Sequence, residues 1–276
     1  MVGGKDAVFG EYTFNVVLKR NEMYFCSGAI IGPQHVITAA HCVIRDDDEE
    51  FQFLALQVVA GTNNYANSEI RGIEIDVVQY YVLSEYYHSR DRKMIDGDIA
   101  VLQLANALDL SRYNSLISSL DLPANNQQYV ENIAMVFGFG WNSMKFDCKT
   151  CDPIRIVGGS LGNLRYAETE ILQFSECPYD SDGIPYGPKH VCARIKQRSA
   201  RHEGLCNGDS GGPLVYDDRI LIAIVRSNNL LCDETYLPSV YTEIAPYREF
   251  IVNSMTGNLD ESIVVISIMN QESNNV

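Results

Sequence analysis

The chain has 276 residues, of which 46% are apolar and 21% charged, a composition that is typical of folded globular proteins and excludes wholesale disorder. No apolar stretch reaches the roughly 18 residues that a membrane-spanning helix needs, which excludes a transmembrane segment. The formal net charge of −15 repels phosphate backbones, so nucleic acid is not expected as a partner.

Short apolar segments follow one another along most of the chain, and Gly, Pro, Asn and Asp separate them. Many short strands without intervening helical repeats predict an all-β barrel or sandwich. In chain order the predicted strands are residues 14–18, 29–31, 35–38, 53–59, 99–104, 134–137, 168–172, 213–216, 220–225 and 239–242.

One helix is predicted, over residues 245–255, with Pro246 in its first turn and Gly257 just beyond its end. Residues 111–128 are polar and rich in turn formers, so they are a candidate linker between two halves. Residues 259–276 form a tail, of which residues 262–269 are a candidate edge strand.

The cysteine content indicates an oxidising compartment. Eight cysteines permit four disulfides, but they allow 105 pairings, so the count does not fix the connectivity. A chain of this size does not need disulfides for want of a core, so their presence favours a secreted protein. No signal peptide opens the sequence, which leaves two alternatives. Either the chain is cytosolic with free thiols, or the sequence starts at a mature end.

Residues 46–50 form the main run of like charge, Asp-Asp-Asp-Glu-Glu. A solvated loop is the simplest interpretation, and a cation site or an acidic surface for a basic partner is the alternative. Calcium sites need oxygen ligands at defined alternating positions, which a bare acidic run lacks, so no metal site is predicted.

Three segments carry residues suited to nucleophilic catalysis. His41 stands beside a cysteine, Asp98 precedes an apolar strand, and Ser210 lies in a glycine-rich turn. A serine hydroxyl is a weak nucleophile until a neighbouring base takes its proton, and histidine suits that role near neutral pH. A buried carboxylate would orient the histidine ring. Taken singly, each segment also fits a structural role, as a packed histidine or a turn.

Together, and in the order His, Asp, Ser, these segments resemble the trypsin/chymotrypsin family of serine proteases. Residues 1–4, Met-Val-Gly-Gly, are similar to the family's mature start, and residues 138–141, Gly-Phe-Gly-Trp, to its Gly-Trp-Gly turn. Residues 238–242 are similar to the segment before its terminal helix.

The resemblance implies two packed six-stranded antiparallel β-barrels with a C-terminal helix, and the active site between the barrels. The expected domains are residues 1–112, with His41 and Asp98, and residues 113–258, with Ser210 and the helix. Residues 259–276 would be an extension.

The resemblance also implies the role of each site residue. Ser210 would be the nucleophile, His41 the general base and then acid, and Asp98 the group that orients His41. Asp96 is the nearby rival, but Asp98 directly precedes the apolar strand as the family pattern requires. The backbone N–H groups of Gly208 and Ser210 would form the oxyanion hole.

Asp209 would pair with the free α-amino group of Met1, the contact that shapes the oxyanion hole after zymogen cleavage in this family. This expectation favours the second alternative for the start of the sequence, with signal and propeptide already removed. The amine exists only if the end of the chain is unblocked.

By resemblance, six of the cysteines would pair as Cys26–Cys42, Cys177–Cys192 and Cys206–Cys232. Cys148 and Cys151 remain, with Cys-x-x-Cys spacing. A local disulfide in a surface loop is the favoured interpretation, and a redox motif or half of a zinc site is the alternative. Titration of free thiols would separate these.

The substrate pocket departs from the trypsin pattern. Gly204 stands where trypsins keep an aspartate, so a basic side chain would lose its ion-pair partner. Asn228 and Ser239 occupy positions where open pockets have glycines, and Asn228 would narrow the entrance. We therefore predict cleavage after apolar or aromatic residues, as in arthropod chymotrypsin-like or elastase-like enzymes.

A second departure follows the strand of residues 220–225, where Arg226-Ser227-Asn228 replaces the family's Ser-Trp-Gly. Arg226 brings a charge close to Asp98. It would either compete with His41 for that carboxylate or extend into solvent, and the sequence does not distinguish these alternatives.

The predicted protein is a secreted, monomeric serine endopeptidase that acts on protein or peptide substrates without a cofactor, and protein inhibitors are possible partners. One alternative is a protease-like binding protein with little or no turnover. The intact His41, Asp98 and Ser210 favour the enzyme, whereas weak or narrow activity is favoured by Arg226, Ser227, Asn228 and Met1. An esterase with the same triad is another.

Overall fold

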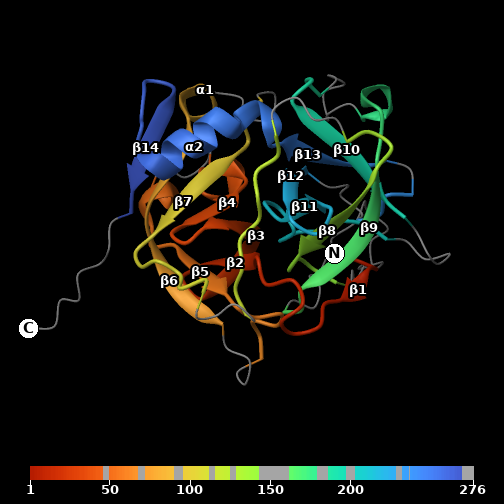
Figure 1. Cartoon of the computed structure of the whole chain (residues 1–276), viewed down its shortest axis with the longest axis horizontal. Helices are drawn as coiled ribbons and strands as arrows, with labels where there is room; N and C mark the ends of the chain where they lie inside the picture. Colours follow the sequence, from red (N-terminus) through yellow and green to blue (C-terminus); the bar gives the residue numbers. More distant parts are fainter. Residues whose placement is uncertain are drawn as a thin grey trace, which may run out of the picture.

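The computed structural model contains two β-sheets, each of which closes on itself as an antiparallel barrel (Figure 1). This confirms the predicted fold class. The residues that the structure describes are 1–45, 50–67, 72–89, 96–111, 116–124, 129–142, 162–178, 186–196, 203–227, 232–235 and 237–268.

Each barrel has six strands around its circumference. In the first barrel the neighbours run β6, β5, β2, β3, β4, β7, and pairing of β6 with β7 closes the ring. Its strands are β2 (Asn15–Arg20), β3 (Met23–Gly32), β4 (His35–Thr38), β5 (Gln57–Ala60), β6 (Ile73–Leu83) and β7 (Ala100–Leu104).

In the second barrel the neighbours run β9, β10, β13, β12, β11, β8, and pairing of β8 with β9 closes the ring. Its strands are β8 (Ile133–Gly138), β9 (Arg165–Ile171), β10 (His190–Ile195), β11 (Pro213–Tyr216), β12 (Ile220–Ser227) and β13 (Ser239–Glu243).

The two ends of the chain each add a strand to a sheet. β1 (Lys5–Asp6) pairs with β9 of the second barrel, and β14 (Ile263–Ser267) pairs with β6 of the first (Figure 1). The candidate edge strand in the tail is therefore present, and Ile266 of β14 joins the core of the first barrel.

Side chains on alternate sides of the strands fill three apolar cores. In β2, Val16 and Leu18 belong to the core of the first barrel, whereas Val17 belongs to a second core between the barrels. Strands that are apolar on both faces, such as β2, therefore hold the barrels together. A third core fills the second barrel and includes the buried side chain of Met1.

Helices are few and short. α1 (Ser84–His88) follows β6, and α2 (Arg248–Thr256) follows a 3-10 turn, Ala245–Tyr247. α2 ends at Gly257, whose φ of 75° is the left-handed conformation that glycine adopts readily. The turn and α2 together correspond to the predicted helix, and its buried Phe250 and Ile251 pack into the core between the barrels. No helix in the described part of the chain is long and apolar enough to span a membrane.

Candidate active site

His41 and Asp98 are brought together by the pairing of two strands. β4 and β7 are antiparallel, and Thr38 at the end of β4 lies opposite Ala100 at the start of β7. The residues that follow β4 therefore lie beside those that precede β7. His41 lies in the 3-10 turn Ala40–Cys42, with its Nδ1 atom 2.7 Å from Oδ2 of Asp98. Its backbone N–H donates to Oδ1 of the same carboxylate at 2.9 Å.

The two groups stabilise each other's charged forms. Asp98 is only 3% exposed, and burial opposes its ionisation, but the charge of His41 and its hydrogen bonds outweigh burial and lower the pKa of Asp98 to about 2. Burial also disfavours the protonated ring, yet Asp98 outweighs it and raises the pKa of His41 above 6.5. The charge of Arg226 lowers both pKa values. Asp98 is thus ionised at neutral pH.

Ser210 lies in a tight turn held against β3 of the first barrel. Ser27 on β3 donates its backbone N–H to the carbonyl of Ser210 at 2.9 Å and its hydroxyl to the carbonyl of Gly208 at 2.8 Å. Gly208 has a φ of +93°, which a residue with a side chain rarely adopts. Within the described residues, the N–H groups of Gly208 and Ser210 donate to no protein acceptor. Two donors thus remain for a ligand beside the Ser210 hydroxyl.

The Ser210 turn adjoins the His41 turn without a direct hydrogen bond between the two side chains among the described residues. The Sγ atom of Cys42 lies 3.8 Å from the carbonyl oxygen of Ser210, so the turns are in contact. Catalytic hydrogen bonds are often long before substrate binds, so the lack of a direct bond between Ser210 and His41 is compatible with proton transfer between them.

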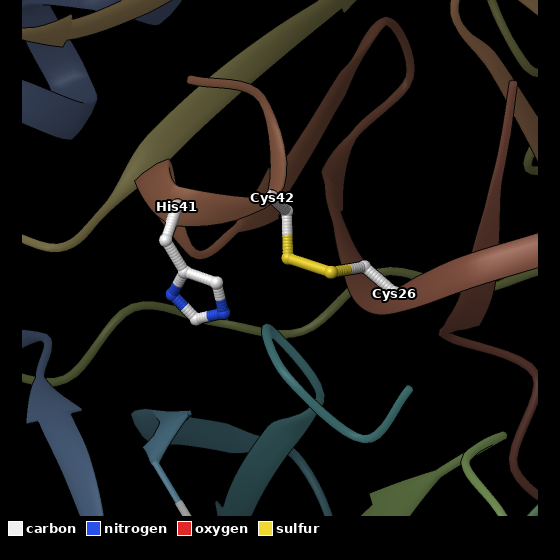
Figure 2. Close-up of side chains that lie close together, drawn as sticks. All are labelled: Cys26, His41 and Cys42. Atoms are coloured by element: carbon white, nitrogen blue, oxygen red, sulfur yellow. A yellow bond between two sulfur atoms is a disulfide. The ribbon is translucent and has the colours of Figure 1, made fainter. Parts of the chain in front are cut away.

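Figure 2 shows His41 beside the disulfide between Cys26 and Cys42. The three potential ligand atoms lie within 4.8 Å of one another, as metal ligands do. The two sulfur atoms are bonded to each other in the disulfide, however, so the cluster lacks the thiolates that a metal would need. The disulfide instead ties the His41 turn to β3.

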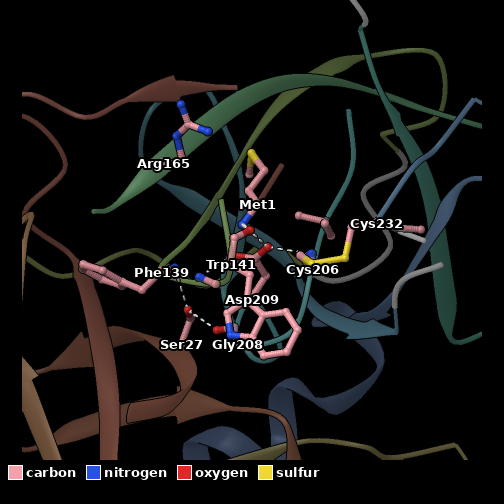
Figure 3. A network of polar contacts seen from close by, with 12 residues as sticks. Met1, Ser27, Phe139, Trp141, Arg165, Cys206, Gly208, Asp209 and Cys232 are labelled. Carbon is pink, nitrogen blue, oxygen red and sulfur yellow. Dashed lines mark hydrogen bonds and ion pairs between the residues drawn. A yellow bond between two sulfur atoms is a disulfide. The ribbon is translucent and has the colours of Figure 1, made fainter. Parts of the chain in front are cut away.

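Asp209 collects hydrogen bonds from three chain segments (Figure 3). The α-amino group of Met1 lies 2.6 Å from its Oδ2 atom, and both side chains are 0% exposed. The N–H of Cys206 donates to Oδ2 and the N–H of Gly140 to Oδ1, each at 2.8 Å. The amine also donates to the carbonyl of Trp141 at 2.8 Å. Burial lowers the pKa of the Met1 amine, and Asp209 partly offsets this effect.

The Asp209 network leaves no room for side chains around it. A Cβ atom at Gly138 would stand 2.1 Å from Oδ1 of Asp209, and one at Gly140 would stand 2.6 Å from its carboxyl carbon. Glycine is therefore required at both positions. The network fixes the backbone just before Ser210, and with it the direction of the two available N–H groups.

Comparisons with known proteins identify the family of the chain. The family model described as Trypsin matches residues 1–251. The chain belongs to the trypsin family. It is 28% identical to Trypsin-1 of Astacus astacus over 258 residues, which cover 91% of this chain and 98% of that protein. It is 26% identical to the chymotrypsin-like protease VLCTLP of Macrovipera lebetinus, over 94% of this chain and 88% of that protein. The solved structure of neuropsin, a serine protease expressed in the limbic system of mouse brain, has the same fold, with a TM-score of 0.70 and 23% identity over 92% of this chain and 100% of that one.

The positions predicted to line a trypsin-family pocket are only partly described. Gly204 is buried and forms an antiparallel β-bridge with Val2. The N–H of each residue donates to the carbonyl of the other, with N···O distances of 2.9 and 3.0 Å. Ser239 begins β13 and is 1% exposed. Ser227 ends β12, and its hydroxyl lies 3.4 Å from that of Tyr186. Asn228 lies outside the described residues.

Arg226 does not extend into solvent, so that alternative from the sequence is wrong. Its side chain is buried, and its guanidinium contacts Nε2 of His190 and lies 5.6 Å from the ring of Tyr186. Asp98 keeps its contacts with His41. The arginine therefore acts on the His41–Asp98 pair through its charge.

The predicted disulfides Cys26–Cys42, Cys177–Cys192 and Cys206–Cys232 are all present. Cys148 and Cys151 lie outside the described residues, as do residues 46–49 of the acidic run. Two buried titratable groups near the predicted pocket, His190 and Glu234, were not among the predicted site residues. His190 begins a strand that was not predicted, and Glu234 follows another acidic residue, a pattern that usually marks a solvated loop.

Proposed function

We propose that this trypsin-family protein is a secreted serine endopeptidase that cleaves peptide bonds through an acyl-enzyme intermediate. The observation that carries the proposal is the contact of 2.7 Å between the Asp98 carboxyl group and Nδ1 of His41, next to the Ser210 turn. A histidine fixed in this way presents its other ring nitrogen as a base. The family membership supports the same reaction class.

In the proposed reaction, His41 takes the proton of the Ser210 hydroxyl as the serine oxygen attacks the substrate carbonyl carbon. His41 then gives that proton to the leaving amine, and the C–N bond breaks to leave an ester on Ser210. Water repeats the sequence, with His41 again as base, and releases the carboxylic acid. Asp98 stays ionised throughout and stabilises the protonated ring of His41.

The negative oxygen formed during attack would be bound by the N–H groups of Gly208 and Ser210. Donors of this kind contribute most when they point at the developing charge before the reaction starts. The Met1–Asp209 pair and the contacts of Ser27 with the Gly208 and Ser210 carbonyls supply that orientation.

We propose peptides with apolar or aromatic residues before the cleaved bond as substrates, because Gly204 offers no carboxylate to pair with Lys or Arg. Protein inhibitors that present such a residue are the corresponding partners. No cofactor takes part in the proposed reaction. A catalytically weak binding protein is the second candidate function, and the buried charge of Arg226 near Asp98 favours it.

Reaction with a fluorophosphonate tests the proposed function, with the adduct measured by intact mass. The wild-type protein should gain one adduct on Ser210, and His41→Ala should gain none because its serine is not activated. His35→Ala, which alters a histidine on β4 away from the site, should react like wild type. An unreactive wild-type protein would favour the binding-protein function, and peptide and ester substrates compared side by side would separate peptidase from esterase.

The charge of Arg226 should shift the lower pH limit of activity, which the pKa of His41 sets. His41 must be neutral to act as base, so activity falls as the pH drops through its pKa, which lies above 6.5. Arg226 lowers that pKa, so Arg226→Met should move the acidic limb of the kcat/KM profile to higher pH. Arg226→Lys retains the charge and should keep the wild-type limb. An unmoved limb in Arg226→Met would show that the arginine does not act on His41.

A further inference from the structure

Glu234 is a buried acid that the proposed reaction does not use. It is 0% exposed and lies two residues after Cys232, which the disulfide to Cys206 fixes beside the Ser210 segment. Its Oε2 atom accepts a hydrogen bond from the N–H of Ile195 at 2.7 Å. Its Oε1 atom accepts bonds from the N–H of Leu205 at 3.3 Å and from the hydroxyl of Ser239 at 2.5 Å. The carboxyl group therefore contacts a predicted pocket residue, Ser239, and the neighbour of another, Gly204.

Gly204 itself cannot supply an acidic side chain. A Cβ atom built there would stand 2.7 Å from the carbonyl carbon and oxygen of Cys232 and 2.8 Å from the nitrogen of Asp233. These are backbone atoms, which cannot move aside as the end of a flexible side chain can. An acid in this part of the fold must therefore come from another chain segment, and Glu234 comes from the segment that closes over Gly204.

The negative charge of Glu234 has no contact ion pair among the described residues. Its three hydrogen-bond donors, Ile195, Leu205 and Ser239, are neutral groups. The charged and titratable groups on the elements packed around it are Arg194 on β10, Tyr241 on β13, and Asp233, Glu203 and Asp209 on the two segments that the disulfide joins.

Burial raises the pKa of Glu234 to about 7, against the opposing effects of its three hydrogen bonds and of Arg194. The acid therefore changes its charge within the neutral range. A buried charge acts strongly on its surroundings, because the protein interior screens it much less than water does.

We propose that Glu234 is a specificity-determining residue whose charge decides whether the pocket binds cationic or neutral side chains. When Glu234 is protonated, the pocket prefers neutral apolar groups. When Glu234 is ionised, its electric field favours a cationic side chain in the pocket, although the two groups do not touch. The inference rests on the proposed function only for the identity of the pocket, and it makes the apolar preference proposed above a property of the lower pH range.

Binding of two small probes tests this directly and needs no catalysis. Benzamidinium is cationic and benzamide is neutral, and the two have similar shapes. Calorimetry at pH 5.5 and pH 8.5 gives the ratio of their dissociation constants at each pH. In the wild-type protein the preference for benzamidinium should rise on the order of tenfold between these pH values. In Glu234→Gln it should change less than about twofold.

Because His41 also titrates in this range, the comparison with Glu234→Gln is decisive. Glu243→Gln, which removes a carboxyl group from the other end of β13, should behave like wild type. Ser239→Ala keeps the acid but removes a bond that lowers the pKa of Glu234, so its transition should move to higher pH. This variant provides a test even if Glu234→Gln fails to fold.

Three results would overturn the proposal: a ratio that does not change with pH in wild type, a change that persists in folded Glu234→Gln, or no binding of either probe. Fluorophosphonate labelling of the same preparations reports on Ser210 and His41 separately. A protein that is labelled but shows no pH-dependent selection retains the proposed function and loses this inference. A protein that selects probes but is not labelled retains the inference and loses the catalytic function.

Discussion

Asp98→Asn should lower kcat by about 10⁴-fold, the scale expected when the orienting carboxylate of a triad becomes an amide. The amide can donate a hydrogen bond to Nδ1 of His41, which favours the tautomer whose other nitrogen carries the proton. That tautomer cannot accept the proton of Ser210. The backbone contacts that place the His41 turn should change little, since β4 and β7 remain paired. Steady-state hydrolysis of a peptide substrate measures the loss, and circular dichroism verifies the fold.

Asp96→Asn is the matched control for Asp98→Asn. Asp96 lies two residues away, is 32% exposed, and contacts Nδ1 of His190 at 3.4 Å instead of His41. Its replacement should change kcat by no more than a few-fold. A large loss in Asp96→Asn, with activity retained in Asp98→Asn, would assign the orienting role to Asp96 and contradict the proposed triad.

Asp209→Asn should reduce both stability and activity. It leaves the ammonium group of Met1 buried without its counter-charge, a change that costs about 3–5 kcal/mol of unfolding free energy and lowers Tm by roughly 10 °C. It also weakens the bonds from Cys206 and Gly140 that hold the backbone before Ser210. Loss of an oriented oxyanion donor lowers kcat by about 10²-fold or more. Thermal unfolding and peptide hydrolysis measure the two effects.

Asp6→Asn serves as the control for Asp209→Asn, because it removes an ion pair near the same end of the chain. Asp6 is 57% exposed where it contacts Arg165, and exposed pairs contribute less than about 1 kcal/mol. Its replacement should leave Tm and kcat close to wild type. If Asp209→Asn were equally mild, the Met1 amine would have no part in shaping the site.

The sequence was informative where local chemistry decides the structure. The Gly-Asp-Ser-Gly-Gly turn and the proline and glycine around α2 each correspond to a feature of the fold. The three disulfides were predicted from the family resemblance, because the cysteines alone leave 105 pairings open. The prediction missed β6 and β10, because Glu74, Asp76, His190 and Arg194 interrupt their apolar pattern. On β6, Glu74 and Asp76 lie on the exposed face, and Glu74 also pairs with Lys19 on β2. On β10, His190 is buried and contacts Arg226 of β12, a partner that its local sequence does not show.

The pocket was the least predictable part of the candidate site for the same reason. Glu234 is charged and adjoins Asp233, so its local sequence favours a solvated loop. Its burial depends on donors from β10, β13 and the Leu205 segment, which only the folded chain brings together. Likewise, the direction of Arg226 depends on His190, which is 36 residues away in the sequence.

The positions of the chain ends have a consequence for how the protein unfolds. The first residues of the chain are built into the second barrel, and the last described strand is built into the first (Figure 1). Each sheet therefore contains a terminal strand, β1 or β14, that is next in sequence to the strands of the other barrel. Neither barrel can unfold without releasing a segment that is connected to the other. The chain should consequently lose its structure in one cooperative transition, and fragments cut between the barrels should not fold independently.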